Sequence, residues 1–510
     1  MSYDLNELRK EIDAVDRDLL ECIERRMAVS RKIGVCKREI GKDILDDSRE
    51  SYKLAKLKNL AGFETERYID EIYQTIFEVS KEHQRKPCFG LLGRTLGHSY
   101  SPQIHSLLTG DYSYSLIERE PDELEDLFKS GVYGGFNVTI PYKKDACALC
   151  DVVEPAAAEM GSVNTVVFDK DGRSYGYNTD YYGFMYMLKS AGIDPAGKTV
   201  LVLGTGGAAC AVNYGLKTMN AAVVRNCDLE TEINYSNVYD ICSDSEIIVN
   251  CTPVGMYPKV DGCVIDISRF SKLEAVCDVI YNPSRTKLIQ EAQKAGLKTC
   301  SGLSMLVAQA YKSSRFFVGD NEGAEKIDKA AEDAIGRVVA KLGSQMKNIT
   351  IIGMPGCGKS LLAQRLAERT GRTLVDLDIA YAERFGETPA DTITNRGEEQ
   401  FRLNETEVAK EYLIKSGLII SCGGGIVTQE RNFFYIRCNS NVIYLDRPLS
   451  MLSRKDRPLS NANGVETLFA QRKDKYEMLA DIRVSLDRFD DKEAFFDAAV
   501  DIINEGGLYI

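Results

Sequence analysis

The segment from Gly353 to Ser360 constrains the fold more than any other part of the sequence. It reads Gly-Met-Pro-Gly-Cys-Gly-Lys-Ser, follows the apolar run NITIIG and precedes a helical pattern. A loop of the form GxxxxGKS or GxxxxGKT between a strand and a helix surrounds phosphate groups with backbone amides, while its lysine meets the β- and γ-phosphates and its hydroxyl holds Mg²⁺. The segment therefore predicts a parallel α/β domain that binds ATP through Gly353, Gly356, Gly358, Lys359 and Ser360, the last also as a magnesium ligand.

A second glycine loop predicts a dinucleotide site near the middle of the chain. The strand-like run KTVLVL leads into Gly204-Thr205-Gly206-Gly207-Ala208-Ala209, and a helical pattern follows. In such G-x-G-x-x-A loops the helix N-terminus binds pyrophosphate. We expect the next strand to end at Arg225 rather than at an acid, and an arginine suits the 2′-phosphate of NADP. The residues expected to bind NADP(H) are Gly204, Gly206, Gly207, Ala208, Ala209, Arg225 and Asn226.

Length and composition limit the remaining possibilities. At 510 residues the chain exceeds one hydrophobic core, so about three domains are expected. The net charge of −12 argues against a nucleic-acid partner, which would need a basic face. No apolar run approaches the roughly 18 residues of a membrane span, and the first residues lack the apolar core of a signal peptide. We expect a cytoplasmic protein, and we interpret Cys147 and Cys150, the only CxxC pair, as structural.

Three regions of the sequence differ in pattern. Residues 1–86 carry helical periodicity, residues 87–343 alternate strand-like and helical runs, and residues 347–510 begin again with NITIIG. We expect an all-α domain, then an α/β domain whose nucleotide-binding part covers about 195–305, then an α/β P-loop domain with a parallel sheet. The boundaries are expected at residues 85–87 and in the polar stretch 341–348.

The first region contains one long apolar stripe. Apolar residues recur at three- and four-residue steps from Leu5 to Cys36, which predicts a helix of about 33 residues, or roughly 50 Å. A domain of this size cannot cover such a helix alone, so we expect a homodimer. The stripe is interrupted by Arg26, which needs an anion if it is buried. Ser80 and Gln84 continue the stripe of a later helix, so polar groups point into the bundle, although a coiled-coil specificity position is the alternative.

The segment LRKEIDAVDRDLLECIERRMAVSRKIGVCK, followed by DDSRES, resembles the all-helical chorismate mutase family along its whole length. The resemblance implies that chorismate rearranges to prephenate in a site that holds a compact conformer and stabilises charge on the ether oxygen. Arginines would bind the carboxylates, Lys37 and Gln84 would face the ether oxygen, and Glu50 would face the hydroxyl. In this family one arginine reaches across from the second protomer, here Arg9. The implied residues are Arg9, Arg26, Lys37, Asp46, Arg49, Glu50, Ser80 and Gln84. The alternative is a dimerisation or chorismate-sensing module.

The middle region resembles shikimate dehydrogenase over some 250 residues. The motifs SYSP at 99–102, NVTIPYK at 137–143, GSVNT at 161–165, YNTD at 177–180, YNP at 281–283 and Met305 to Gln309 carry the resemblance. It implies that Lys143 and Asp180 are the catalytic pair, because reduction of a ketone needs a proton on oxygen. It also implies that the substrate is bound by Ser99, Ser101, Asn137, Thr139, Asn164, Tyr281 and Gln309. Arg225-Asn226-Cys227 departs from the family's usual Asn-Arg-Thr at the cofactor site, and a quinate-using relative is the alternative.

The last region resembles shikimate kinase in the residues that follow its P-loop. These are Asp376-Leu377-Asp378, the segment RGEEQFRLNE at 396–405, Ser421-Cys422-Gly423-Gly424-Gly425 and Arg457-Pro458-Leu459. The resemblance implies that shikimate is held by Asp378, Arg402, Gly424 and Arg472, that Asp376 supports Mg²⁺ and that Arg457 neutralises the transferring phosphoryl group. Arg454 is a candidate for the adenine contact. A gluconate or nucleotide kinase is the alternative.

Together the resemblances imply a trifunctional enzyme of aromatic biosynthesis. Its substrates would be 3-dehydroshikimate, shikimate and chorismate, and its cofactors NADP(H), ATP and Mg²⁺. The middle domain would make the substrate of the last domain, whereas two steps of the pathway separate the last domain from the first.

Overall fold

The computed structural model describes residues 4–97, 99–325, 327–452, 464–485 and 492–508. The chain divides into two compact units, one formed by residues 1–179 with 310–326 and the other by residues 180–309 with 327–510. Within the described residues, no helix is both long enough and apolar enough to cross a membrane.

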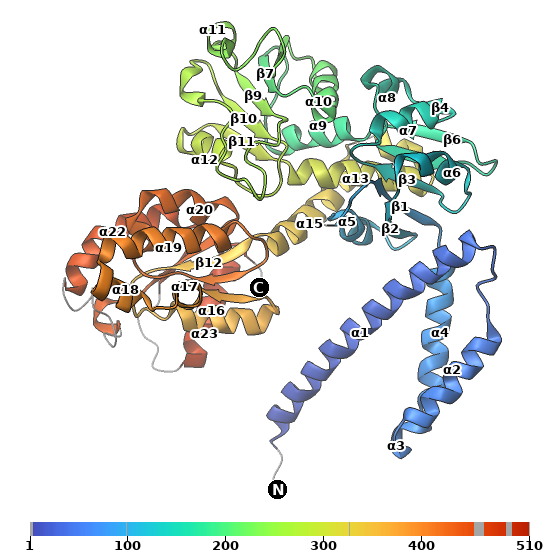
Figure 1. The fold of residues 1–510 in the computed structure, drawn as a ribbon, viewed down its shortest axis with the longest axis horizontal. Coiled ribbons are helices and arrows are strands. Elements are labelled where there is room, and N and C mark those ends of the chain that lie inside the picture. Colours follow the sequence, from blue (N-terminus) through green and yellow to red (C-terminus); the bar gives the residue numbers. More distant parts are fainter. Residues whose placement is uncertain (1–3, 98, 326, 453–463, 486–491, 509–510) are drawn as a thin grey trace. The chain divides into compact units, whose positions relative to one another are not determined.

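The first unit begins with four helices. They are α1 (Leu5–Glu39), α2 (Asp47–Leu60), α3 (Phe63–Glu66) and α4 (Ile69–Arg85). The long first helix agrees with the prediction, and α4 packs along α1 while α2 packs along α4 (Figure 1). The apolar stripe of α1 is largely uncovered, since Leu8, Ile12, Val15 and Leu19 are between 42 % and 55 % exposed.

A six-stranded mixed sheet completes the first unit. Its strands are β1 (Cys88–Gly93), β2 (Ser113–Glu118), β3 (Gly135–Val138), β4 (Val152–Val153), β5 (Thr165–Phe168) and β6 (Ser174–Tyr177), in the order β2-β1-β3-β5-β6-β4. The helices are α5 (Ser101–Leu108), α6 (Leu124–Lys129) after the short η1 (Pro121–Glu123), α7 (Lys143–Leu149) and α8 (Pro155–Met160). The second half of α13 (Leu303–Phe317) also belongs here, and Phe317 stacks on Phe89 with ring centroids 4.3 Å apart.

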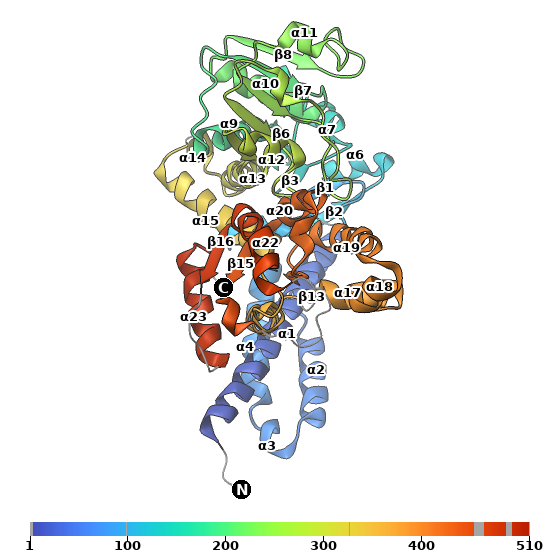
Figure 2. The same cartoon turned by 90° about the vertical axis from the view of Figure 1, so that its left-hand side faces the viewer.

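The second unit opens with a five-stranded sheet whose neighbouring strands are all parallel. The order is β11-β10-β9-β7-β8, from β7 (Thr199–Leu203), β8 (Val223–Cys227), β9 (Ile247–Asn250), β10 (Ala275–Asp278) and β11 (Lys298–Ser301). The helices are α9 (Asp180–Ser190), α10 (Gly207–Thr218), α11 (Val238–Cys242), η2 (Ile267–Arg269), α12 (Lys287–Lys294) and α15 (Lys329–Met346), whereas the short α14 (Asn321–Glu325) belongs to the first unit. Figure 2 shows α10 beside β7. This is the arrangement expected of a Rossmann-type nucleotide domain.

A second parallel sheet of five strands follows, in the order β13-β14-β12-β15-β16. The strands are β12 (Asn348–Ile352), β13 (Leu374–Asp376), β14 (Ile419–Ser421), β15 (Ser440–Asp446) and β16 (Ile482–Ser485). The α-helices are α16 (Lys359–Thr370), α17 (Leu377–Phe385), α18 (Pro389–Arg396), α19 (Glu398–Leu413), α20 (Phe433–Cys438), α22 (Val465–Leu479) and α23 (Lys492–Glu505), with short turns η3 (Ile426–Thr428), η4 (Glu430–Asn432) and η5 (Leu449–Met451). The central strand β12 is fully buried, as a parallel sheet covered on both faces requires.

The polar stretch expected to form a boundary at 341–348 is helical for most of its length. Helix α15 continues to Met346, and only Lys347 separates it from β12. Its last turn is fixed by Arg372, whose guanidinium donates to the carbonyls of Ser344 at 2.7 Å and Lys347 at 3.0 Å. The polar residues of this stretch therefore form the last turns of a helix and not a separate linker.

Candidate active sites

One cavity of about 550 Å³ gathers most of the residues predicted for the P-loop domain. Parallel strands end at the same edge of a sheet, so the loops after β12, β13 and β14 meet there. The predicted residues that line the cavity are Gly356, Lys359, Ser360, Asp376, Asp378, Arg402, Gly424 and Arg472. Gly353 and Gly358 belong to the same loop. Arg454 and Arg457 lie outside the described residues.

The phosphate loop has the backbone conformation that its glycines predict. Gly353, Gly356 and Gly358 have φ values of 147°, 85° and 103°, in the region that favours glycine. Lys359 donates to the carbonyls of Gly353 and Met354 at 3.1 and 3.0 Å. The ammonium is therefore held over the loop, where a phosphate oxygen can replace these carbonyls.

Two oxygen ligands stand together beside the loop. The Ser360 hydroxyl donates to Asp376 Oδ2 at 2.8 Å and lies 3.2 Å from the Ser421 hydroxyl. Asp376 also accepts from the backbone N–H of Asp378 at 3.0 Å, which fixes its carboxylate at the start of α17. Hydroxyl and carboxylate oxygens are the ligands that Mg²⁺ prefers, so Ser360 and Asp376 fit this ion.

The other side of the cavity carries a buried ion pair. Arg402, 4 % exposed, contacts Glu405 at 2.8 Å and Glu398 at 3.0 Å. Burial raises the pKa of Glu405, and the guanidinium of Arg402 opposes that rise. A β-carbon on Gly425 would overlap both terminal nitrogens of Arg402, so glycine is needed for the guanidinium to lie where it does.

A second buried arginine lies across the cavity. Arg472 donates to the Gly424 carbonyl at 3.1 Å, which the Tyr476 hydroxyl also contacts, while Arg472 Nε is buried with no hydrogen-bond partner among the described residues. Two guanidiniums and Asp378 thus face one space, as a hydroxylated carboxylate would require. The roles of Glu405 and Tyr476 were not predicted: Glu405 ends the segment 396–405 but its pairing with Arg402 has no sequence signal, and Tyr476, which contacts the Gly424 carbonyl, belongs to no motif.

The dinucleotide loop has the predicted conformation, but the strand that follows it ends later than predicted. Gly204 has φ of 98° and Gly206 caps α10. The expectation that the next strand ends at Arg225 is wrong, because β8 continues to Cys227 and Asp228 follows. Arg225 lies inside the strand, and its guanidinium is paired with Asp244 and donates to the Ile241 carbonyl at 3.1 Å. Arg225 and Asp244 therefore satisfy each other on the α11 side of the sheet.

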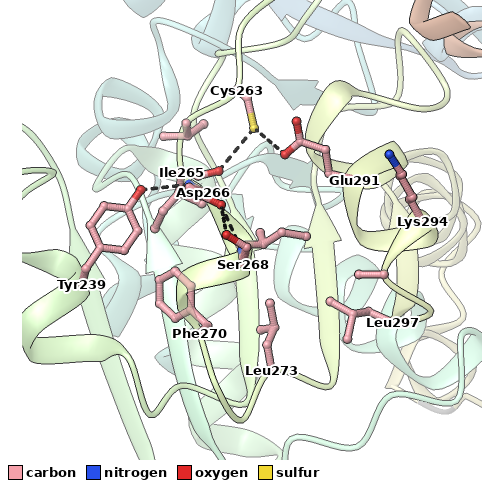
Figure 3. A pocket seen from close by; sticks show the side chains of 13 residues that line it. Tyr239, Cys263, Ile265, Asp266, Ser268, Phe270, Leu273, Glu291, Lys294 and Leu297 are labelled. Atoms are coloured by element: carbon pink, nitrogen blue, oxygen red, sulfur yellow. Dashed lines mark hydrogen bonds between the residues drawn. The ribbon is translucent and has the colours of Figure 1, made fainter. Parts of the chain in front are cut away.

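A larger cavity of about 740 Å³ lies on the same domain and holds none of the predicted residues (Figure 3). Tyr239, Cys263, Asp266, Phe270 and Glu291 are among its lining residues. Its polar groups bond one another, as when the Cys263 thiol contacts the Ile265 carbonyl at 3.4 Å. The cavity is therefore a surface hollow between α11 and α12, and several of its polar groups are bonded to one another.

The predicted substrate residues of the first unit form a polar network. The hydroxyls of Ser99 and Ser101 lie 3.2 Å apart. Asn164 Oδ1 accepts from the Thr179 backbone N–H at 2.7 Å. Asn137 is buried, accepts from Tyr114 and donates to three oxygens, so its amide supports the neighbours of Asn164. The Thr139 backbone N–H donates to the Leu92 carbonyl at 2.9 Å.

The predicted proton-transfer pair occupies two helix starts in different units. Lys143 is the first residue of α7 in the first unit, and Asp180 is the first residue of α9 in the second. Their pairing stays a prediction. In the second unit the Gln309 amide donates to the Leu306 carbonyl at 2.8 Å.

The loop that carries Tyr281 is anchored by a buried acid. Asp278, at the end of β10, accepts from the Thr286 hydroxyl at 2.7 Å, from the Ile280 backbone N–H at 3.1 Å and from the Asn250 amide at 3.1 Å. Burial raises the pKa of Asp278 to about 6, and these hydrogen bonds oppose the rise. Asp278 thereby closes the loop of residues 279–286, which contains Tyr281.

The helical domain brings several cations together. Arg26 donates to the Ser80 hydroxyl, and burial lowers the pKa of Arg26. Burial lowers the pKa of Lys53, and the nearby charges of Arg26 and Arg49 lower it further. Three cations therefore converge where a dianion would be stabilised. Lys53 was not predicted, because it continues the exposed face of α2 without any sequence signal.

The other predicted residues surround this group of cations. Lys37 donates to the Ile44 carbonyl at 2.6 Å, and Glu50 pairs with Lys81 at 3.3 Å. Gln84 donates to Ser30, while its Oε1 is buried with no hydrogen-bond partner among the described residues. Asp46 caps α2 by accepting from the Arg49 backbone N–H at 3.1 Å. Arg9 lies on the exposed face of α1.

Fold and sites together define a chain that joins a helical domain, a dinucleotide-binding α/β domain and a P-loop domain. Family models match all three parts: "Chorismate mutase type II" at residues 8–85, "Shikimate dehydrogenase substrate binding domain" at 91–166 and "Shikimate kinase" at 355–503. These matches confirm the three resemblances read from the sequence.

Curated relatives identify the family of the middle part. A shikimate dehydrogenase (NADP(+)) of Clostridium perfringens is 36% identical over 268 residues, which cover 48% of this chain and 96% of the relative. One from Methanosarcina mazei is 32% identical over 277 residues, which cover 49% of this chain and 99% of the relative. The chain therefore belongs to the shikimate dehydrogenase family, with a chorismate mutase and a shikimate kinase domain beside it.

Solved structures match the same half of the chain. A chorismate mutase/shikimate 5-dehydrogenase fusion protein from Clostridium acetobutylicum is 34% identical, with a TM-score of 0.47, and the match covers 51% of this chain and 97% of that one. A shikimate 5-dehydrogenase from Thermus thermophilus is 30% identical, with a TM-score of 0.42, and the match covers 49% of this chain and 99% of that one.

We predict that Asp278→Asn stabilises the dehydrogenase part at neutral pH. The pKa of Asp278 is about 6 in the folded protein and 3.8 in the unfolded chain. Between these values the folded state holds the extra proton, so stability falls as pH rises from about 4 to 6, and the cost above pH 6 is about 3 kcal/mol. Asparagine removes this cost.

Thermal unfolding of both proteins from pH 5 to 8 measures the effect. The advantage of Asp278→Asn should grow up to about pH 6 and then stay constant. A difference that does not change with pH would contradict a buried, titrating Asp278. Asp240→Asn, a change of the same kind on α11, is the control.

Proposed function

We propose that this chain is a trifunctional enzyme of the shikimate pathway. It reduces 3-dehydroshikimate to shikimate with NADPH, phosphorylates shikimate at the 3-hydroxyl with ATP, and rearranges chorismate to prephenate. The observation that carries the proposal is the kinase cavity, where a phosphate loop, Asp378 and two buried arginines face one another in a member of the shikimate dehydrogenase family. We also propose a cytoplasmic location, because ATP and NADPH are the co-substrates.

In the kinase domain the described residues divide the work. Arg402 and Arg472 bind the substrate carboxylate, after Arg402 exchanges part of its contact with Glu398 or Glu405. Asp378 accepts the proton of the attacking hydroxyl and orients it toward the phosphate loop. ATP supplies the phosphoryl group when it is bound. Lys359 stabilises its oxygens, and Ser360 with Asp376 holds Mg²⁺. Arg457 neutralises the transferring phosphoryl group, and Arg454 contacts the adenine of ATP.

In the dehydrogenase domain the proposed chemistry rests on Lys143 and Asp180. NADPH supplies a hydride when it is bound. Lys143 donates the proton to the carbonyl oxygen, and Asp180 keeps the amine protonated and oriented. Ser99, Ser101, Thr139, Asn164, Tyr281 and Gln309 hold the hydroxyls and the carboxylate, while Asn137 supports Asn164 by donating to its carbonyl at 3.3 Å.

In the helical domain the cations do the main work. Arg26, Arg49 and Lys53 bind the two carboxylates of chorismate, and Lys37 with Gln84 stabilises charge on the ether oxygen. The group of Gln84 that can donate to this oxygen is Nε2, which in the described structure donates to the Ser30 hydroxyl at 3.2 Å. Arg9 belongs to the site of the second protomer. We propose a homodimer, because the uncovered stripe of α1 is apolar and a second copy of α1 can cover it.

A coupled assay tests the central proposal. The full chain supplied with 3-dehydroshikimate, NADPH and ATP should oxidise NADPH and release shikimate 3-phosphate, measured by absorbance and by mass spectrometry. Without ATP the product should stop at shikimate. Lys359→Ala should abolish only the second step, since the dehydrogenase does not use the P-loop. Accumulation of shikimate in the complete wild-type reaction would contradict the kinase assignment.

Gly425→Ala tests whether the position of the Arg402 guanidinium determines shikimate binding. The new methyl group would overlap the guanidinium, so kcat/KM for shikimate should fall about 100-fold while KM for ATP changes little. Gly336→Ala is the matched control, because a β-carbon there meets no atom within 4 Å. An equal loss of ATP binding would point to collapse of the cavity rather than displacement of Arg402.

Mixed dimers test the mutase site and the dimer together. Arg9→Ala and Lys37→Ala should each lower chorismate turnover at least 100-fold, because each removes a cation from the site. After equal amounts are mixed and re-associated, about a quarter of wild-type activity should return, because half of the dimers then hold one intact site. No recovery would contradict a site shared by two protomers. No turnover by the wild-type chain would leave the helical domain as a binding module.

A further inference from the structure

An acid stands at the end of β8, directly beside the dinucleotide loop. Asp228 Oδ2 accepts from the Thr205 backbone N–H at 2.9 Å and from the Thr205 hydroxyl at 2.6 Å. Its other oxygen accepts from the Leu229 backbone N–H at 2.8 Å. Thr205 lies between Gly204 and Gly206, so these contacts fix the carboxylate against the loop that binds pyrophosphate.

The carboxylate keeps both its charge and a free acceptor position. Hydrogen bonds from Thr205 and Leu229 lower the pKa of Asp228, so it is ionised at neutral pH. An ionised carboxylate accepts about four hydrogen bonds, and the described residues supply three. The remaining acceptor position is on Oδ1. A ligand group that binds there must donate a hydrogen bond, as a hydroxyl does.

The cation expected to receive a 2′-phosphate is engaged elsewhere. Arg225 is three residues before Asp228, and its guanidinium is paired with Asp244. Side chains alternate across a strand, so Arg225 and the buried Cys227 share one face of the sheet, and that face is covered by α11. The edge of the sheet therefore presents Asp228 rather than Arg225.

We propose that Asp228 accepts a hydrogen bond from the adenosine ribose 2′-hydroxyl, so that the dehydrogenase uses NAD(H) alongside NADP(H) and Asp228 sets the ratio. A hydroxyl can donate to Oδ1, whereas a 2′-phosphate places one or two negative charges beside the carboxylate. The inference rests on the proposed dehydrogenase function and names the residue that selects its cofactor.

Direct binding of NADH and NADPH to the full chain tests the inference, with nicotinamide fluorescence as the readout. Wild type should bind NADH within about tenfold of NADPH. Asp228→Asn keeps the shape and removes the charge, so the ratio of the two Kd values should move at least about tenfold toward NADPH. Asp228→Ser should move it the same way, which guards against one variant that folds poorly.

Glu230→Gln is the matched control, because it removes an exposed charge from the same loop without touching Thr205. Its Kd ratio should equal that of wild type. Wild type that binds NADPH more than 100-fold tighter than NADH, or Asp228 variants with an unchanged ratio, would overturn the inference. If both nucleotides bind as expected but 3-dehydroshikimate is not reduced, the proposed reaction fails and the cofactor inference stands.

Discussion

Parallel strand pairing is the constraint on which the nucleotide and kinase sites depend. When every strand of a sheet runs the same way, all its carboxyl ends emerge along one edge, and the loops that follow must meet there. The buried β12 carries the phosphate loop to that edge, and β13 and β14 carry the acids and glycines that face it. The sheet around β7 does the same for the dinucleotide loop and Asp228. The parallel connection of the strands therefore determines where each site lies, whichever side chains line it.

Charged groups in these sites are held by partners that a ligand can replace. Arg402 rests on two glutamates, Lys359 on two loop carbonyls and Arg26 on Ser80. A buried ion without a partner would cost several kcal/mol, so these contacts stabilise the charged groups within the fold. They also orient each cation in advance, which reduces the reorganisation needed when an anion binds.

The sequence was most informative where glycine patterns and family motifs coincide. The order of the domains, the long first helix and the residues around the phosphate loop were all predictable, because these features depend on local spacing. Three features were not. The end of β8 was placed two residues early, because Arg225 is as compatible with a strand interior as with its end. Lys53 carries no motif, and Glu405 lies in the segment 396–405 without any sign there of its pairing with Arg402, since both roles arise from which charges lie near them in space. The helical path of residues 341–346 was hidden by its polar composition, which suits a solvated helix as well as a loop.

The junction between α15 and β12 has a consequence for how the chain withstands proteases. A single residue, Lys347, connects the helix to the central strand of the kinase sheet, and Arg372 clamps the last helical turn from the kinase side. Proteases cut most readily where a backbone of several residues can leave its hydrogen bonds and enter a cleft. The junction has no such free segment, so limited digestion should leave the P-loop domain attached to α15. The residues on either side of Lys347 are part of the packed structure, since Met346 and Asn348 are both buried.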